Sequence, residues 1–163
     1  MMAAVLPAYF ITFHTCGTWL HGDLRGSVDR EHNVPRTPFL PADEALRRRD
    51  ATKLARPAVR LGGEARRIVH RTILEVCRHR DWTLHALNVR TTHVHAVVSA
   101  GPPPERVMND LKAWCTRRLM AAGLHERARH IWARHGSTKW LNTRAALDRA
   151  CRYTLDGQGP DLM

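Results

Sequence analysis

The segment that most constrains the fold is the run Arg90-Thr-Thr-His-Val-His-Ala-Val-Val-Ser99. In a β-strand, successive side chains point to opposite faces. One face of this strand is apolar and must pack against a core; it carries Val94, Ala96 and Val98. The other face carries His93 and His95, with Cα atoms roughly 6.5–7 Å apart. Two imidazoles at that spacing can be plain surface histidines, or they can converge on one divalent ion or one phosphate.

The remaining hydrophobic patterns alternate between strand and helix periods. The predicted elements, in chain order, are a strand Tyr9–Thr15, a helix Glu64–Arg80, a strand Trp82–Val89, the histidine strand, a helix Glu105–Ala122, a strand–turn–strand over Ile131–Leu141 centred near Gly136, and a helix from Asn142 or Thr143 to about Leu155. This order predicts an α+β fold of ferredoxin-like type (β–α–β–β–α–β). One antiparallel sheet would carry two helices on one face, with an additional C-terminal helix.

We expect residues 1–163 to form a single domain, since this length can bury a substantial core. Residues 16–63 form a long irregular insertion between the first strand and the first helix, rich in glycine and proline, with a short helix expected at Pro41–Arg49. The arginines of helix Glu64–Arg80 fall outside its apolar stripe, and we assign them no role in the site.

The chain is strongly basic, with 26 Lys and Arg against 15 Asp and Glu. Only three of these cations are lysine, and the planar arginine fork suits phosphate contacts. A nucleic acid is therefore the expected partner, with an anionic membrane surface as the second candidate. No run of about 18 apolar residues exists in the sequence, so we expect no membrane span.

The four cysteines lie far apart and form no C-x-x-C motif. We interpret them as reduced packing residues of a cytoplasmic protein and not as a disulfide framework or a zinc cage. The apolar start of the chain lacks a basic segment and a cleavage site, so it does not predict a signal peptide.

In the predicted fold, the C-terminal helix is the only element left to cover the histidine face of the sheet. It carries Tyr153 at the edge of its apolar stripe. Tyr153 is either a packing residue or a nucleophile whose attack on phosphorus is assisted by a nearby metal ion and by arginines. Gln158 is the first candidate for a third metal ligand, and Asp156 is the second.

Here the chain resembles a known family. His93-Val94-His95 is similar to the His–hydrophobic–His motif of the HUH endonucleases, and the single downstream tyrosine resembles that of the single-tyrosine transposases. The likeness extends over most of the chain, from Tyr9 to about Gly159, and is strongest to the REP-associated tyrosine transposases of bacteria. It implies a cytoplasmic, nucleoid-associated bacterial protein.

The resemblance implies an enzyme that cuts single-stranded DNA next to hairpins through a 5′-phosphotyrosine intermediate and frees a 3′-OH. Tyr153 would be the nucleophile, and His93 and His95 would bind Mg²⁺ or Mn²⁺. In the insertion-sequence enzymes a glutamine follows the tyrosine at i+4, whereas here position 157 is Gly and Gln158 lies at i+5. Gln158 can therefore act only if the helix unwinds near Gly157. The relatives imply either a monomer or a homodimer.

A single strand needs a positive groove and stacking surfaces. The predicted DNA-binding residues are Arg90, Lys112, Arg117, Arg134, Lys139, Arg149 and Arg152, with Trp114, Trp132 and Trp140 as candidates for stacking.

Three alternatives remain open. The chain could be a non-catalytic ferredoxin-like nucleic-acid-binding protein, such as a decayed or domesticated transposase. It could be a phosphoesterase built on paired H-x-S/T motifs, of which the sequence has no second copy. It could also be a zinc protein, which the scattered cysteines disfavour.

Overall fold

The computed structural model describes residues 6–18, 42–52, 57–126 and 129–157. Its elements in chain order are β1 (Ala8–Thr15), α1 (Glu44–Thr52), α2 (Gly63–His79), β2 (Thr83–Val89), β3 (His93–Ser99), α3 (Pro104–Ala121), β4 (Trp132–Leu141) and α4 (Arg144–Asp156).

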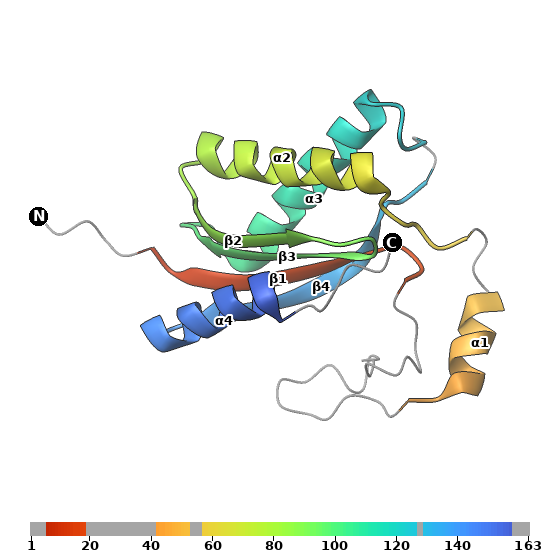
Figure 1. Ribbon diagram of the computed structural model, residues 1–163, viewed down its shortest axis with the longest axis horizontal. Helices are drawn as coiled ribbons and strands as arrows, with labels where there is room; N and C mark the ends of the chain where they lie inside the picture. The colour runs from red at the N-terminus through yellow and green to blue at the C-terminus, as the bar shows by residue number, and fades with distance from the viewer. Residues whose placement is uncertain (1–5, 19–41, 53–56, 127–128, 158–163) are drawn as a thin grey trace, which may run out of the picture.

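The four strands form one sheet in the order β2-β3-β1-β4, and every neighbouring pair is antiparallel. Helices α2 and α3 cover one face of this sheet, and α4 covers the other (Figure 1). The predicted α+β ferredoxin-like fold with an additional C-terminal helix is thus confirmed.

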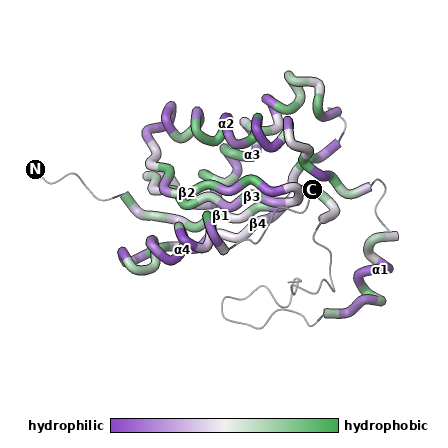
Figure 2. The backbone as a smooth tube through the Cα atoms, viewed as in Figure 1, coloured by the Kyte–Doolittle hydropathy of each residue, from purple (hydrophilic) through white to green (hydrophobic). Residues whose placement is uncertain are grey.

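The main core lies between the sheet and the α2–α3 layer, where the alternation of strand residues places their apolar side chains. Ile11, Val94, Ile73 and Leu111 are fully buried in it. Hydrophobic and hydrophilic residues alternate along α2 (Figure 2), as expected of a helix with one buried face. A smaller apolar cluster on the opposite face joins α4 to the sheet and is built from Ala86, Val97 and Ala150.

The prediction of a strand–turn–strand centred near Gly136 is wrong, because Trp132–Leu141 forms the single strand β4. Gly136 pairs with Phe13, and the register of β4 shifts between Phe13 and Thr15. A Cβ atom on Gly136 would lie 2.5 Å from Met108 Sδ and 2.5 Å from the Thr12 carbonyl oxygen. The glycine therefore permits a close approach inside a bulged strand instead of forming a turn.

Part of the predicted insertion is outside the described residues, namely 19–41 and 53–56. The short helix expected at Pro41–Arg49 occurs as α1, shifted to Glu44–Thr52. Asp43 caps it, since its Oδ1 accepts a hydrogen bond from Leu46 N at 3.0 Å.

All four cysteines are free thiols, as predicted. Burial raises the pKa of the Cys77 thiol to about 11 and, together with the neighbouring Cys77, that of Cys115 to about 12. Both therefore act as packing residues. Among the described helices, none is both long and apolar enough to cross a bilayer.

Candidate functional site

The histidine pair lies on the face of β3 that α4 covers, opposite the main core. The His93 and His95 rings are edge to face, with centroids 4.8 Å apart. His95 is buried and His93 is half-buried. The predicted division of this strand into an apolar face and a histidine face is correct.

Hydroxyl groups bond the δ nitrogens of both rings. Thr12 Oγ1 on β1 lies 2.8 Å from His95 Nδ1, and Thr92 Oγ1 lies 3.1 Å from His93 Nδ1. Thr12 reaches His95 because the two residues are direct partners in the β1–β3 pairing. Hydrogen bonds of this kind fix the orientation of an imidazole and select the ε nitrogen as the atom that could bind a metal ion.

Tyr153 lies next to the pair. Its ring centroid is 5.7 Å from that of His95 and 5.9 Å from that of Phe10, in an edge-to-face arrangement with both. Phe10 in turn stacks on His95 at 5.4 Å. Tyr153 is 49% exposed. The structure thus brings together the three residues that the sequence singled out, and it leaves half of the tyrosine side chain accessible to solvent.

A side chain caps the start of α4, and a hydrogen bond from the sheet holds its end. Thr143, one of the two residues at which the sequence predicts the helix to begin, caps it by accepting a hydrogen bond from Ala146 N at 3.1 Å. At the other end, Asn88 Nδ2 on β2 donates to the Thr154 carbonyl at 2.9 Å. The helix ends at Gly157, whose N–H donates to the Tyr153 carbonyl.

The second tyrosine of the chain cannot substitute for Tyr153. Tyr9 is 1% exposed within the main core. Burial and the nearby Glu105 carboxylate raise the pKa of its phenol, so the phenolate of Tyr9 forms less readily. The structure therefore distinguishes the two phenols by face and by exposure.

Of the two residues predicted as a third metal ligand, only Asp156 lies within the described residues. Gln158 lies outside the described residues. Asp156 is exposed in the last turn of α4. Within the described part of the chain, no group of three or more His, Cys, Asp or Glu side chains could hold a metal ion. The histidine pair alone could supply two imidazole ligands, leaving other positions of an ion open.

Three predicted DNA-binding residues lie on α4 or on the tyrosine face of the sheet, and a fourth lies beside the histidine strand. Arg149 and Arg152 are exposed on α4, one turn before and directly before Tyr153. Lys139 is exposed on β4 and pairs with Phe10, so it lies on the tyrosine face. Arg90 precedes β3 and its N–H bonds the His93 carbonyl at 2.8 Å.

The other predicted cations lie elsewhere. Arg134 is exposed in the bulged part of β4. Arg117 is on α3, in the layer opposite α4, with its guanidinium 4.9 Å from the centre of the Trp114 ring. Lys112 is buried, and its ammonium donates to the carbonyls of Ala133 and His135 at 3.0 and 3.1 Å. Burial lowers its pKa. We therefore remove Lys112 from the predicted DNA surface, because its charge satisfies the carbonyls of the β4 bulge.

Of the three candidate stacking residues, Trp132 is buried and donates from Nε1 to the Lys112 carbonyl at 3.1 Å, so it is a core residue. Trp114 is half-buried against the main core. Trp140 is 55% exposed and pairs with Tyr9, which places it on the α2–α3 face of the sheet. None of the three lies on the tyrosine face.

Three further residues lie at the histidine pair without having been predicted there from the sequence: Phe10, Thr12 and His14. His14 is buried with its ring 5.4 Å from that of His93. The alternation of Tyr9–Thr15 already placed these three residues on one face of a strand. The pairing of that strand with β3, which sets the register, carried no sequence signal.

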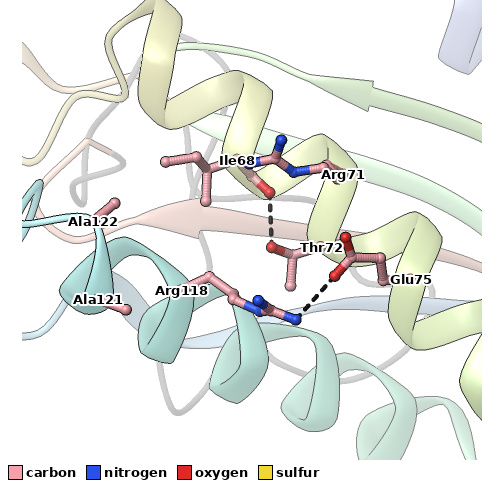
Figure 3. Close-up of a pocket in the computed structure, with 7 residues that line it drawn as sticks. All are labelled: Ile68, Arg71, Thr72, Glu75, Arg118, Ala121 and Ala122. Atoms are coloured by element: carbon pink, nitrogen blue, oxygen red, sulfur yellow. Dashed lines mark hydrogen bonds and ion pairs between the residues drawn. The ribbon is translucent and has the colours of Figure 1, made fainter.

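A separate cleft of about 260 Å³ lies between α2 and α3 (Figure 3). The Glu75–Arg118 ion pair, at 3.0 Å, lines it, and the Thr72 hydroxyl beside it donates to the Ile68 carbonyl. Glu75 and Arg118 bond each other there, and the cleft lies in the layer opposite α4, so it takes no part in the site.

The fold and the site together define a ferredoxin-like domain with a histidine pair against a C-terminal tyrosine. The profile of the family described as "Transposase IS200 like" matches residues 55–153, a range that contains both histidines and ends at the tyrosine. The chain belongs to this family of transposases. No match was found among curated proteins.

Among solved structures, the chain is similar to that of a REP-associated tyrosine transposase bound to a REP hairpin. The TM-score is 0.51 and the identity 12%, over 94% of this chain and 67% of the other. At this identity the likeness supports the fold alone.

Proposed function

We propose that this chain is a metal-dependent, single-stranded DNA endonuclease and strand transferase that cuts next to DNA hairpins. Membership of the IS200-like transposase family supports this proposal. The hairpin bound to the structurally similar transposase also supports it. The observation that carries it is the Tyr153 ring against His95, on a face of the sheet bordered by exposed cations.

In this proposal Tyr153 is the nucleophile. Its phenolic oxygen attacks the scissile phosphorus and loses its proton, while the bond from phosphorus to the 3′ oxygen breaks and that oxygen takes up a proton. The downstream strand stays bound to Tyr153 through its 5′ phosphate, and the upstream strand leaves with a 3′-OH. Attack of a 3′-OH on the phosphotyrosine reverses the step and joins strands.

The donor atoms fit a divalent ion held in part by the protein, because two oriented imidazoles leave positions for phosphate oxygens and water. His93 and His95 would hold it through their ε nitrogens, with Gln158 as the proposed third ligand. Mg²⁺ or Mn²⁺ bound there would neutralise the negative charge that develops on the scissile phosphate. Arg149 and Arg152 of α4, together with Lys139, add fixed positive charge beside the scissile phosphate.

The test uses a single-stranded hairpin oligonucleotide from the DNA flanking the gene, labelled at its 3′ end. With Mn²⁺ or Mg²⁺ present, the wild type is expected to carry the label with the protein on a denaturing gel. Tyr153→Phe is expected to lose this adduct and keep DNA binding. Tyr9→Phe is the matched control, because it removes the same hydroxyl from the core, and it is expected to form the adduct.

An oligonucleotide labelled at its 5′ end tests the polarity, since it should yield a shortened product with a free 3′-OH and no adduct. If Tyr153→Phe forms as much adduct as the wild type, the nucleophile assignment is wrong. If the wild type binds the hairpin and never forms an adduct with either metal, the chain is a non-catalytic binding protein.

A further inference from the structure

A second cleft, of about 420 Å³, lies between the first two turns of α2 and the edge strand β2. Its lining consists of Gly63, Arg66, Arg67, His70, Leu87, Asn88 and Val89. Two of these side chains are arginines and one is a histidine, while none of the lining residues is acidic. The cleft therefore carries a concentrated positive charge next to an apolar strand edge.

The helix dipole at the start of α2 favours an anion, and the one acidic residue of the first turn, Glu64, is not in the cleft lining. Its N-cap residue, Gly62, has no side chain to cap the helix, and the first intrahelical bond runs from Arg66 N to the Gly62 carbonyl. The amide groups of the first turn point out of the helix start, where an anion is stabilised. Arg67 Nη1 lies 3.6 Å from the position of a Cβ on Gly63, so the guanidinium folds back over this first turn.

Two hydrogen bonds place the cleft at the end of the sheet that carries the histidines. Leu61 N, just before α2, donates to the Thr91 carbonyl at 2.7 Å. Asn88, in the cleft lining, pairs with His95 across β2 and β3. Its amide also donates to the Thr154 carbonyl, one residue beyond Tyr153. The cleft therefore lies on β2, the strand next to the one that carries His95, and the Asn88 side chain joins it to α4.

We propose that this cleft binds a backbone phosphate of the same DNA strand that reaches the site formed by His95 and Tyr153. The inference rests on the proposed function, and it reverses the expectation that the arginines of this helix have no role in a site. Arg66 and Arg67 contact the phosphodiester, and the edge of β2 carries the strand from the cleft to α4. A DNA strand on this path crosses Asn88.

The first experiment measures binding without cleavage. Fluorescence anisotropy with a labelled hairpin oligonucleotide bearing single-stranded flanks, in the presence of a chelator, gives the Kd at several salt concentrations. Arg67→Gln is expected to weaken binding about tenfold. It should also reduce the slope of log K against log salt by about 0.7, the value for one single-strand phosphate contact.

Arg78→Gln is the matched control, because it removes the same charge from an exposed position in the last turn of the same helix, outside the cleft. It is expected to change the Kd less than twofold. Equal thermal midpoints for the two variants exclude a folding defect. If Arg67→Gln and Arg78→Gln have equal Kd values and equal salt slopes, the cleft does not bind the backbone.

A second experiment locates the phosphate. Each backbone phosphate of the flanks is replaced in turn by an uncharged methylphosphonate. One replacement is expected to weaken binding to the wild type and to have no further effect on Arg67→Gln. If the penalty of every replacement is the same in both proteins, the proposed contact does not exist. Neither experiment involves cleavage. A missing covalent adduct would refute the proposed function and leave the phosphate contact standing, whereas equal binding by Arg67→Gln and Arg78→Gln would refute the phosphate contact and leave the proposed function standing.

Discussion

The two faces of the sheet are built from the same strands and differ in the side chains that they bury. On β1, Ile11 is fully buried in the main core under α2 and α3, while its neighbour Thr12 faces α4 and bonds His95. On β3, Val94 and His95 divide in the same way. The α2–α3 face gathers apolar side chains, and the α4 face gathers polar rings and hydroxyls around a small apolar cluster. We therefore expect stability to reside mainly on one face and chemistry on the other.

The largest effect is expected for the histidines. His93→Ala or His95→Ala should reduce adduct formation about a thousandfold, because the metal ion that we propose at this pair would contribute several kcal/mol to stabilising the transition state. Hairpin binding in the absence of metal should change little. Isothermal titration with Mn²⁺ and the gel assay for the adduct check this. A variant that cuts at the wild-type rate would contradict the assignment of this face.

Paired truncations test the contrast in stability between the faces. Leu111→Ala, in the main core, should lower the free energy of unfolding by about 3 kcal/mol, as expected of a fully buried leucine. Leu147→Ala, half-buried under α4, should lower it by about 1 kcal/mol. Urea unfolding of both variants measures the difference. Equal losses would show that α4 contributes as much to folding as the main core.

Two lysines on neighbouring elements separate charge that stabilises from charge that binds. Lys112→Met should lower the free energy of unfolding by about 2 kcal/mol, because the carbonyls of Ala133 and His135 lose their donor. Lys139→Met, at an exposed position, should leave stability within about 0.5 kcal/mol. Its effect should be weaker DNA binding instead. Unfolding and anisotropy measurements on both variants test the two expectations, and the opposite pattern would restore Lys112 to the DNA surface.

These lysines also show what sequence patterns can and cannot predict. The period-2 alternation of residues 91–99 and the helical stripe of α2 predicted the correct faces, because side-chain direction follows directly from local backbone geometry. The prediction that Lys112 binds DNA is wrong because the burial of its ammonium depends on the bulge in β4. The local sequence does not indicate that the carbonyls of Ala133 and His135 will face it. The prediction of a turn at Gly136 is wrong for the same reason. The position requires a glycine because Met108 approaches it closely, and this tertiary contact cannot be predicted from the local sequence.

The proximity of the candidate site residues was predictable in part for a related reason. His93, His95 and Tyr153 each lie on a strongly patterned element, so the sequence alone placed them on one side of the sheet. Thr12 was missed, since its role depends on being paired with His95 in the β1–β3 register. Register between strands distant in sequence comes from the whole fold and not from either strand alone.

The register therefore makes a prediction of its own. Thr12→Val keeps the shape of the side chain and removes the hydroxyl that bonds His95 Nδ1. We expect about a tenfold weaker affinity for Mn²⁺ and a similar loss of cleavage at low metal concentration, the effect typical of losing a group that orients a ligand histidine. Saturating Mn²⁺ should restore part of the rate, and Thr12→Ser should restore the affinity. An unchanged metal affinity would mean that the hydroxyl does not orient the ring.

The smallest effect is expected at the end of α4, where a substitution changes the direction of the Tyr153 ring and not the packing of the core. A Cβ on Gly157 would lie 2.8 Å from Tyr153 Cδ2 and 2.9 Å from the Tyr153 carbonyl oxygen. Gly157→Ala must therefore displace the ring or the last helical turn. Because a nucleophile depends on its alignment, we expect adduct formation to slow about fivefold, with the affinities for DNA and Mn²⁺ unchanged.

Gly101→Ala is the control for this change, because an added Cβ there meets no atom within 4 Å. It should form the adduct at the wild-type rate. A tyrosine that only packs against the sheet would tolerate the displacement, and Gly157→Ala would then affect thermal stability alone. If Gly157→Ala slows adduct formation and leaves thermal stability unchanged, the Tyr153 ring must be aligned with a phosphate and does more than pack on His95. That result assigns the chemistry to the α4 face.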